Sequence, residues 1–537
     1  MSKRLRELGI EIPPDEDTPL VRKLVAVIER LFDEIDRLKG LPELPKRAPV
    51  APSPLSDDSA PPSKQQADRK QARKKRKRPK NHKRSKLAQL KPAQTITLQP
   101  DNVPADAKPI GAKCFIVQEL NLEAVTIRYR RQRYRLADGS ILEAGRPDHL
   151  RSQFGPNLKA FVLYQYFHNQ VTLPLLQRQL ADLGISISAG QISRMITEGQ
   201  ESFHAEKESL LAAARDVSTF FQTDDTGAKH NGKNGHTLHI GNELFAYFVT
   251  TDSKNRLNFL EAIRSPYTDY VLGEDALFYL ECHKFPARVL ASLKAQLGEQ
   301  VVWESASQWE TQLDRWKITN ADHRRRLTEA AVWGSVMMHD LYIDQPFLSD
   351  DAGQFKLFGF THGLCWLHAE RHVARLVPMN QRQHAALEKT RDAIWHYYQE
   401  LKRFREAPSE AAADRLRTEF DRRFLERTGW PVLNEALRTI HRKKDELLLV
   451  LEHPTLPLHN NLSENDIRQF AKLRKISGSS RSEAGRRCRD TFISLKTTCR
   501  KLGVSFWYYL RDRITGSAQI RPLGDILRQA ATCRSNP

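Results

Sequence analysis

Residues 219–226 read Thr-Phe-Phe-Gln-Thr-Asp-Asp-Thr, and Gly227 follows them. Aromatic and β-branched residues favour strands, so this stretch predicts a strand that ends at its two acids. Because side chains alternate across a strand, Asp224 and Asp225 should point to opposite faces, and only one of them should enter a shared site. An acid at a strand end is most often a structural or turn residue, but a carboxylate held there is also a good ligand for Mg²⁺ or Mn²⁺.

The residues that follow predict an antiparallel sheet. Residues 229–235, Lys-His-Asn-Gly-Lys-Asn-Gly, form a turn signal that leads into a second strand at 236–240. A third strand is predicted at 244–249, and a helix completes the region to residue 265. A three-stranded meander followed by a helix is how the ribonuclease H-like fold begins, so we predict an α/β core of that type.

A second acidic stretch lies at residues 345–355, Gln-Pro-Phe-Leu-Ser-Asp-Asp-Ala-Gly-Gln-Phe. It predicts a short strand that ends in Asp350 and Asp351. Asp351 stands three residues before Gln354 and fits a helix N-cap with a capping-box partner. That leaves Asp350, at the strand tip, as the better metal ligand.

A cysteine and a histidine follow this second stretch. Residues 364–367, Leu-Cys-Trp-Leu, predict another buried strand that carries Cys365, and His368 comes directly after it. Two such side chains do not make a zinc site. We therefore expect Cys365 and His368 to pack and hydrogen-bond beside a site formed by other residues.

The third acidic stretch is residues 457–468, Pro-Leu-His-Asn-Asn-Leu-Ser-Glu-Asn-Asp-Ile-Arg. Either Asn460 or Asn461 can cap a helix. Glu464 and Arg468 are four residues apart and share a helix face. If Asn461 is the cap, Glu464 is an ordinary capping-box glutamate, and that role competes with metal binding for the same carboxylate.

Composition and charge narrow the class of protein. The chain has 537 residues, with 85 Lys and Arg against 65 Asp and Glu, a formal net charge of +20. Such an excess predicts a polyanionic partner, nucleic acid or an anionic membrane surface. No apolar run approaches the length of a membrane span and no signal-peptide core follows the N-terminus, so we expect a soluble cytoplasmic protein. The six cysteines include no Cys-x-x-Cys pair, which argues against a zinc ribbon or a redox motif.

The N-terminal part of the chain predicts a helix and a basic linker. Residues 15–40 carry apolar side chains at heptad spacing: Leu24, Ile28, Leu31, Ile35 and Leu38. The seam fits either a short, dimerising leucine-zipper coiled coil or one helix docked on a core. Residues 41–93 predict a disordered Pro-rich and basic linker. Its like-charged run should bind phosphates through residues that include Lys74, Lys75 and Arg76.

Two further regions separate the linker from the acidic stretches. Residues 94–146 predict a small β region, in which 125–135 are strand-like and basic and 137–140, Ala-Asp-Gly-Ser, are a hairpin turn signal. Residues 147–217 predict helices, and 172–196 have the helix-turn-helix pattern, with a second helix that opens on a Ser cap. In that pattern the second helix enters the major groove, whereas an ordinary helical hairpin is the alternative. Its candidate DNA contacts are Gln191, Ser193 and Arg194.

The region between the second and third acidic stretches predicts a helical insertion. Residues 372–452 are rich in Ala, Leu, Glu and Arg, with apolar residues at helical spacing. Their basic cluster at 441–444 fits a solvated helix face better than a binding site. The residues at 516–537 are predicted as a C-terminal tail.

Three motifs together carry a family resemblance: Thr-Asp-Asp-Thr-Gly at 223–227, Ser-Asp-Asp-Ala-Gly-Gln-Phe at 349–355 with the Cys-Trp-Leu-His that follows, and Asn-Asn-Leu-Ser-Glu at 460–464 with Arg468. They resemble the insertion-sequence transposases of the IS66 family, which are DDE enzymes. The order of the regions resembles that family too. It implies a ribonuclease H-like catalytic core, 218–371 and 453–515, interrupted by the helical insertion.

The resemblance implies a DNA transposase that binds the ends of its insertion sequence and catalyses metal-dependent cleavage and strand transfer. It implies Asp224, Asp350 and Glu464 as the catalytic triad and as the ligands of Mg²⁺ or Mn²⁺, with Arg468 and Arg481 near DNA phosphates. The implied partners are terminal inverted repeats, target DNA and a second copy in a homodimer or higher oligomer, with accessory proteins of the same element as further candidates. The implied location is the bacterial cytoplasm, at the nucleoid and away from membranes.

The chain also departs from the family pattern. The usual zinc-binding cysteine cluster before the helical region is absent, with only Cys114 there, so the resemblance does not extend to zinc. Asp225 stands where Glu is common, and His459 stands where an acid often precedes the Asn pair, but both changes leave the triad intact. Two other functions also fit the sequence: a catalytically inactive DNA-binding protein derived from a transposase, and a ribonuclease H-like nuclease that cuts without strand transfer.

Overall fold

The computed structural model describes Val25 and residues 93–99, 104, 108, 112–146, 152–342, 344–356 and 359–535. The chain divides into two compact units, Met1–Ile116 and Val117–Pro537, and every element described below belongs to the second. Apart from Val25, the predicted zipper helix at 15–40 lies outside the described residues, and so do Lys74, Lys75 and Arg76.

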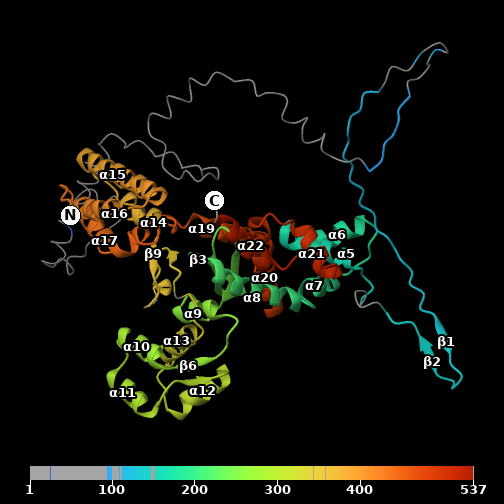
Figure 1. Cartoon of the computed structure of the whole chain (residues 1–537), viewed down its shortest axis with the longest axis horizontal. Coiled ribbons are helices and arrows are strands. Elements are labelled where there is room, and N and C mark those ends of the chain that lie inside the picture. The colour runs from blue at the N-terminus through green and yellow to red at the C-terminus, as the bar shows by residue number, and fades with distance from the viewer. Residues whose placement is uncertain are drawn as a thin grey trace, which may run out of the picture. The chain divides into compact units, whose positions relative to one another are not determined.

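A five-stranded mixed sheet organises the fold, which is mixed α+β (Figure 1). Its strands are β3 (Phe221–His230), β4 (Lys233–Gly241), β5 (Ala246–Thr251), β8 (Phe347–Ser349) and β9 (His362–Leu364). The strand order is β5-β4-β3-β8-β9, in which β3, β4 and β5 form an antiparallel meander and β8 and β9 run parallel to β3. The meander and the helix after it, α9 (Arg256–Arg264), appear in the order predicted from the sequence. The assignment of this sheet to the ribonuclease H-like fold stays a prediction.

Strand β3 is longer than predicted, because it continues through the two acids to His230. Asn231 and Gly232 have positive φ values of 46° and 77° and form a two-residue hairpin turn. That backbone twist suits an Asn-Gly turn between antiparallel strands. Strand β4 therefore pairs with β3 along its full length, from Lys233 opposite His230 to Gly241 opposite Gln222.

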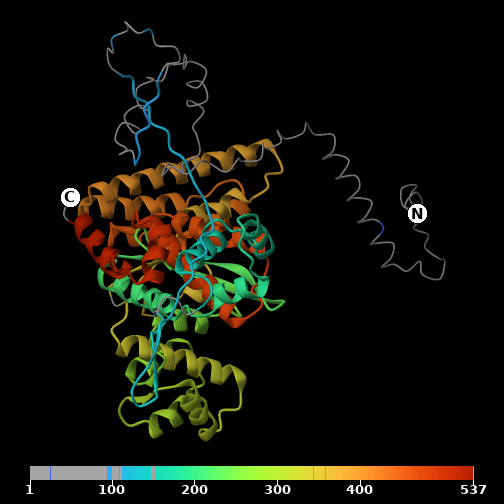
Figure 2. The same ribbon diagram turned by 90° about the vertical axis from the view of Figure 1, so that its right-hand side faces the viewer.

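Helices cover both faces of the meander (Figures 1 and 2). On one face, Ala228 of β3 and Phe248 of β5 pack against Phe470 of α19 (Asn461–Ser477) and against α20 (Glu483–Lys501). On the other face, Phe221 belongs to the main hydrophobic core, together with Phe259 of α9. The period-two alternation of β3 thus directs even-numbered side chains toward α19 and odd-numbered side chains toward α9.

Helices from both ends of this unit pack together. They are α5 (Pro156–Leu163), η2 (Tyr164–His168), α6 (Leu173–Asp182), α7 (Ala189–Thr197), α8 (Glu201–Val217), α21 (Phe506–Thr515) and α22 (Leu523–Ser535). Helix α8 contacts α20 and α22, and α5 contacts α21. The predicted tail at 516–537 contains α22. Leu523 and Leu527 in its first turns are fully buried, because α22 packs on α8.

The helix pair predicted at 172–196 is present as α6 and α7. Ser188 caps α7 in a full capping box: its hydroxyl accepts from the backbone of Gln191, and the Gln191 side chain accepts from the backbone of Ser188. Helix α7 also contacts α5 and α20, so part of its surface is covered by protein.

A second inserted region precedes β8. It comprises β6 (Tyr270–Leu272), α10 (Glu274–Cys282), α11 (Ala287–Gln296), β7 (Val301–Trp303), α12 (Ala306–Arg315) and α13 (Ala321–Met338). Strands β6 and β7 form a separate two-stranded sheet. Trp309 lies at its centre, with its ring stacked on Tyr270 and edge-on to Trp303 and Trp316. This aromatic cluster supplies a packing centre of its own.

The region after β9 is helical. It contains α14 (Trp366–Ala374), α15 (Gln381–Glu406), α16 (Glu410–Phe424), α17 (Pro431–His441), α18 (Lys444–Leu447) and η4 (Leu449–Leu451). The short helix η3 (Gly353–Phe355) lies between β8 and β9. These helices bury Tyr397, Phe420 and Leu433 in a hydrophobic core separate from the main one. The strand predicted at 364–367 was wrong, because β9 ends at Leu364 and Cys365 is the N-cap of α14.

The prediction of a solvated basic cluster at 441–444 was also wrong. His441 Nε2 lies 2.8 Å from Asp421 Oδ1, and Lys444 Nζ lies 2.7 Å from Asp421 Oδ2. Lys443 pairs with Asp351. These ion pairs join α17 and α18 to α16 and to the segment after β8, so most of the cluster is structural.

Two short strands, β1 (Arg133–Arg135) and β2 (Ile141–Glu143), form an antiparallel hairpin. The predicted turn is correct: Gly139 has a φ of 84°, and the Asp138 carboxylate accepts from the backbone of Ser140 at 2.9 Å. The strand itself is shorter than the 125–135 stretch predicted for it. Among the described helices, none is both long enough and apolar enough to cross a bilayer.

Candidate active site

The parallel pairing of β3 with β8 brings two of the predicted acids together. Phe221 lies opposite Phe347, and the next residue of each strand continues that register. The same offset places Asp350, the first residue after β8, beside Asp224. Two acids far apart in the sequence therefore become neighbours through sheet register alone.

Asp224 and Asp225 face opposite sides of the sheet, as their alternation predicts. Asp224 is paired in register with His239, whose ring contacts α19. Asp225 faces the α9 side, where its carboxylate lies 3.1 Å from Lys254 Nζ and accepts from the Gln354 side chain. Asp224 is thus the acid that shares a face with α19.

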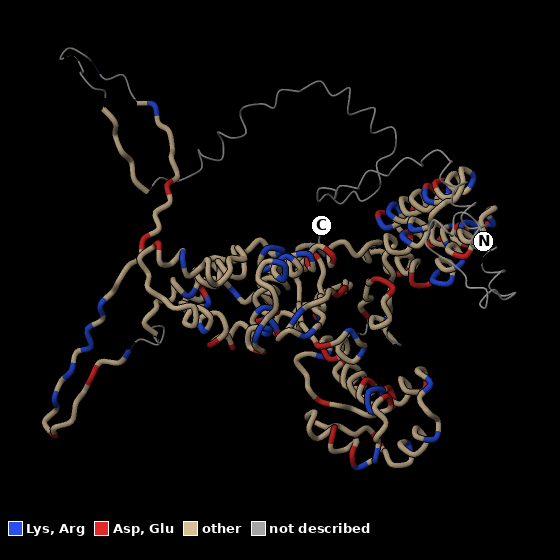
Figure 3. Tube along the Cα trace, turned by 180° about the vertical axis from the view of Figure 1, so that it is seen from behind, with Lys and Arg blue, Asp and Glu red and all other residues tan. Residues whose placement is uncertain are grey.

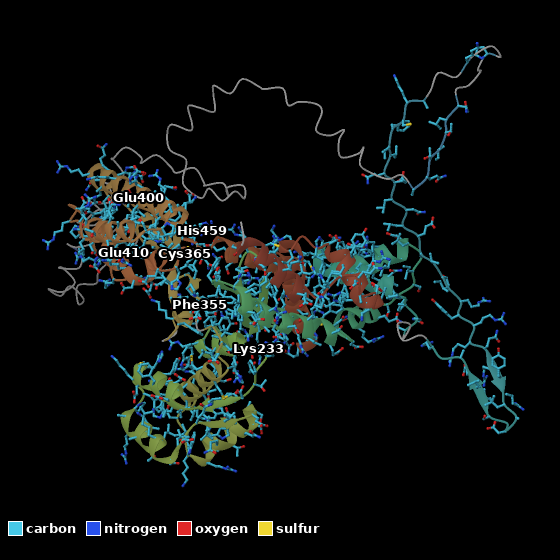
Figure 4. The ribbon with its side chains drawn as sticks, in the orientation of Figure 1. Lys233, Phe355, Cys365, Glu400, Glu410 and His459 are labelled. Carbon is cyan, nitrogen blue, oxygen red and sulfur yellow. The ribbon has the colours of Figure 1, made fainter. Side chains whose placement is uncertain are left out.

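The segment before α19 is attached by buried hydrogen bonds to β3 and to Cys365, the N-cap residue of α14. The backbone N–H of Asn460 donates to the Cys365 Sγ at 3.2 Å, and its side-chain amide donates to the Thr223 carbonyl at 2.9 Å. The Gln222 amide donates to the His459 carbonyl at 2.9 Å. Figure 4 labels Cys365 and His459 at this junction. These contacts hold the first turn of α19 at the level of Asp224.

Glu464 lies in that first turn, and the capping-box interpretation of it is wrong. Asn460 is the N-cap residue, but its side-chain oxygen accepts no capping bond, and its side-chain amide donates to the Thr223 carbonyl. Asn461 is already inside the helix. The Glu464 carboxylate is therefore not occupied by the cap.

Three basic side chains surround the Glu464 carboxylate. Its Oε1 lies 3.9 Å from His368 Nε2 and 3.8 Å from Arg371 Nη2, and its Oε2 lies 3.5 Å from Arg468 Nη2. The His368 ring also contacts Arg371 Nη1 at 2.7 Å. Burial and the Arg371 charge lower the pKa of His368, so its ring is neutral near pH 7 and accepts from Arg371.

The electrostatics of Asp224 show that the three acids interact. The pKa of Asp224 is raised to about 7, first by burial and then by the carboxylates of Asp350 and Glu464. Like charges this close destabilise one another unless a proton or a cation neutralises them. The three predicted acids therefore form one electrostatic cluster.

The cluster can be tested for its fit to a metal ion. Among the described residues, no three His, Cys, Asp or Glu side chains are already arranged to hold one. The donors, however, are carboxylate oxygens, which Mg²⁺ and Mn²⁺ prefer. Glu464 Oε1 is also buried and lacks a hydrogen-bond partner among the described groups. The chemistry of the donor set therefore fits a divalent cation, although its geometry would have to tighten.

A buried polar network stands behind this cluster and was not predicted. His239 Nδ1 lies 2.6 Å from Ser463 Oγ, and His239 Nε2 lies 3.4 Å from Asp466 Oδ2. Lys501 Nζ lies 2.5 Å from Asp466 Oδ2. Burial raises the pKa of Asp466, but the contacts with His239 and Lys501 outweigh it and hold that pKa at about 2. Ser463 and Asp466 lie within two residues of Glu464 in the sequence. This closeness to a candidate metal ligand was the signal that could have predicted their role.

Two other predictions near the cluster have clear outcomes. Asp351 is not a helix cap: it pairs with Lys356 Nζ at 2.6 Å and with Lys443, while Asp350 Oδ1 accepts from the Ala352 backbone at 3.1 Å. Cys365 packs beside the cluster as expected, and burial raises the pKa of its thiol to about 11. A thiol that stays protonated is a poor zinc ligand.

The predicted DNA contacts lie in separate places. Arg468 has an exposed side chain next to Glu464. Arg481 is exposed in the loop between α19 and α20, where the neighbouring Ser480 pairs with His230 at the end of β3. On α7, Arg194 is exposed, whereas Gln191 and Ser193 are half-buried. The structure thus brings Arg468, but neither Arg481 nor the α7 residues, into contact with an acid of the cluster.

Comparison with known proteins relates these elements to a family. Residues 286–487 match the family described as "Transposase IS66 family". That segment includes Asp350, Glu464 and the helices between them, and it begins after Asp224. The chain is also 41% identical over 329 residues to an uncharacterized protein, y4jO, from Sinorhizobium fredii. The alignment spans 60% of this chain and the whole of that protein.

Proposed function

The chain belongs to the IS66 family of transposases, and from this premise we propose that it binds the ends of its own insertion sequence and catalyses metal-dependent cleavage and strand transfer of DNA. One arrangement carries the proposal: the register of β8 on β3 sets Asp350 beside Asp224, and the bond from the Asn460 amide to the Thr223 carbonyl tethers the first turn of α19, which carries Glu464, next to them. The strand order, with β3 antiparallel to β4 and parallel to β8, supports a ribonuclease H-like core.

In this proposal Asp224, Asp350 and Glu464 hold Mg²⁺ or Mn²⁺. The bound ions would activate the attacking water or 3′-hydroxyl and stabilise the leaving oxygen in an in-line displacement at phosphorus. Burial and the neighbouring carboxylates raise the pKa of Asp224, and a bound cation would favour its ionised form. The same three carboxylates serve the cleavage step and the joining step, so no covalent bond to the enzyme is required.

The basic residues around Glu464 are proposed to position the DNA. Arg371 and Arg468 have partly exposed guanidinium groups on either side of its carboxylate. A guanidinium group suits bidentate binding of phosphate. The neutral His368 ring accepts from Arg371 and orients its guanidinium group toward the site. The scissile phosphate would then lie between these arginines and the three acids.

The test uses purified protein and a labelled fragment that carries the end of its own element. Wild type with Mg²⁺ should cut the fragment at the terminus, and Asp224→Asn should not. Glu464→Gln should still bind the fragment but fail to cut it, and retained cleavage by Glu464→Gln would sink the assignment. Product analysis separates a transposase from a nuclease, because only strand transfer joins the cut end to a second DNA molecule.

A further inference from the structure

The hairpin of β1 and β2 has no role in the proposed chemistry. Arg133 pairs with Glu143 and Arg135 with Ile141, so these four side chains share one face of a two-stranded ribbon. Every described residue from 117 to 146 is exposed to solvent. The ribbon therefore has no described protein layer on either of its faces.

Basic residues recur along the chain that leads into this hairpin (Figure 3). Residues 125–135 contain five arginines and no acid: Arg128, Arg130, Arg131, Arg133 and Arg135. The alternation places Arg131, Arg133 and Arg135 on the same face. Glu143 lies 3.2 Å from Arg131, but both side chains are exposed, so the pair neutralises little of this charge.

The opposite face of β1 and β2 carries an apolar pair that is equally uncovered. Tyr134 and Leu142 are paired in register on it, with 63% and 57% of their surfaces exposed. Neither belongs to any hydrophobic core of the described residues. A ribbon with five arginines in one strand stretch and an uncovered apolar pair is expected to have a partner.

We propose that this ribbon binds duplex DNA, with Arg131, Arg133 and Arg135 on the phosphates of one groove. The major groove admits a two-stranded β-ribbon. Alternate residues of a strand are about 7 Å apart, which is about the rise of two base pairs at 3.4 Å each along one DNA strand. The charge disfavours a second copy of the chain as the partner, because two ribbons in contact would bring their arginines together.

The inference rests on the proposed function, since it supplies a DNA-binding surface far in sequence from the acids. It is tested by DNA binding without metal, in the Asp224→Asn background, so cleavage plays no part in the measurement. The probe is a short fluorescent duplex of arbitrary sequence, titrated at several salt concentrations. The variant that combines Arg131→Ala, Arg133→Ala and Arg135→Ala should have a less steep fall of log K with log salt. The steepness should decrease by about 0.9 for each phosphate that the protein no longer neutralises, or by about 2–3 in total.

Two control variants sharpen the result. Replacing the same three arginines by lysine should retain the slope, because lysine also binds phosphate as a point charge. Replacing Arg422, Arg438 and Arg442 by alanine removes the same charge from exposed positions on α16, on α17 and just after α17 and should leave the slope unchanged. All these side chains are exposed, so melting temperatures should stay at the wild-type value.

The outcomes separate the inference from the proposed function. An unchanged slope in the triple-alanine variant overturns the inference, whether or not the wild type cuts DNA. If the triple-alanine variant has a less steep salt dependence but the wild type never cuts its element end, DNA binding by the ribbon is supported and the proposed transposase activity is refuted. A third outcome concerns self-association. If Tyr134→Ser combined with Leu142→Ser abolishes a self-association that the wild type shows, and the triple-alanine variant keeps the wild-type salt slope, the ribbon is a dimer contact and the inference fails.

Discussion

The bond between the Asn460 amide and the Thr223 carbonyl should decide where Glu464 lies. Asn460 is fully buried and is the N-cap residue of α19, and Thr223 immediately precedes Asp224. Asn460→Ala removes the hydrogen bond, worth about 1 kcal/mol, and leaves the carbonyl without this donor, which costs about 1–3 kcal/mol. The loss is partly offset, because Asn460 Oδ1 is itself buried without a partner among the described groups. We expect the free energy of unfolding to fall by about 1–3 kcal/mol.

The effect on cleavage should exceed the effect on stability. If the first turn of α19 shifts by about 1 Å, the Glu464 carboxylate moves away from Asp224, and a misplacement of that size costs about 100-fold in rate. The assay measures Mg²⁺-dependent cleavage of the labelled end fragment, with the folded fraction measured in parallel. DNA binding without metal should be retained, because the tether contacts neither α7 nor the exposed arginines.

A matched control variant separates the tether from general destabilisation. Asn434 on α17 makes a comparable set of bonds, in which its amide donates to the Thr428 carbonyl at 3.0 Å and its oxygen accepts from the Thr428 backbone at 2.8 Å. Asn434→Ala should lose similar stability and keep its cleavage rate. If Asn460→Ala cuts DNA at the wild-type rate while both variants lose stability, the tether does not position Glu464 and the reasoning fails.

Three other measurements test the same structure. Asp225→Asn should keep cleavage while Asp224→Asn loses it, because Asp225 faces the α9 side; loss in both would show that the two faces are not separated. Millimolar Mg²⁺ should raise the melting temperature of the wild type, since a ligand bound only to the folded state stabilises it, and Glu464→Gln should show a smaller rise in the same thermal scan. Burial raises the pKa of Asp490 to about 6, above its unfolded value of about 3.9, so the free energy of unfolding should fall as pH rises from about 4 through 6. Asp490→Asn should flatten that fall in urea titrations, and an unchanged pH profile would contradict the assigned pKa.

Much of the local structure was predictable, because local chemistry determines it. The Asn-Gly turn after β3 and the Ser188 cap of α7 each depend on a few adjacent residues. Strand alternation predicted that only one of Asp224 and Asp225 should enter a shared site, and the family resemblance pointed to Asp224. The three acids could be named as candidates from their motifs, but their approach to one another could not be deduced from those motifs.

Features that depend on distant partners were missed. Strand β3 runs past its acids because β4 pairs with it, although acids and glycine are poor strand formers. Asp351 looked like a helix cap, but Lys443, almost a hundred residues later in the chain, takes its carboxylate. Asn460 looked like a capping residue, but the Thr223 carbonyl takes its amide. In each case a tertiary contact replaced the local partner that the sequence offered.

The residue types available to the site, the turns and caps of its elements and the excess of positive charge can all be read from the amino-acid sequence. Only the tertiary structure decided that Asp350 stands beside Asp224, through the register of β8 on β3. It also decided that the first turn of α19, which carries Glu464, is tethered to the residue that precedes Asp224. The physical reason is that side-chain alternation and capping are set by neighbours along the chain, whereas sheet register and buried tethers are set by pairings between segments that only folding brings together.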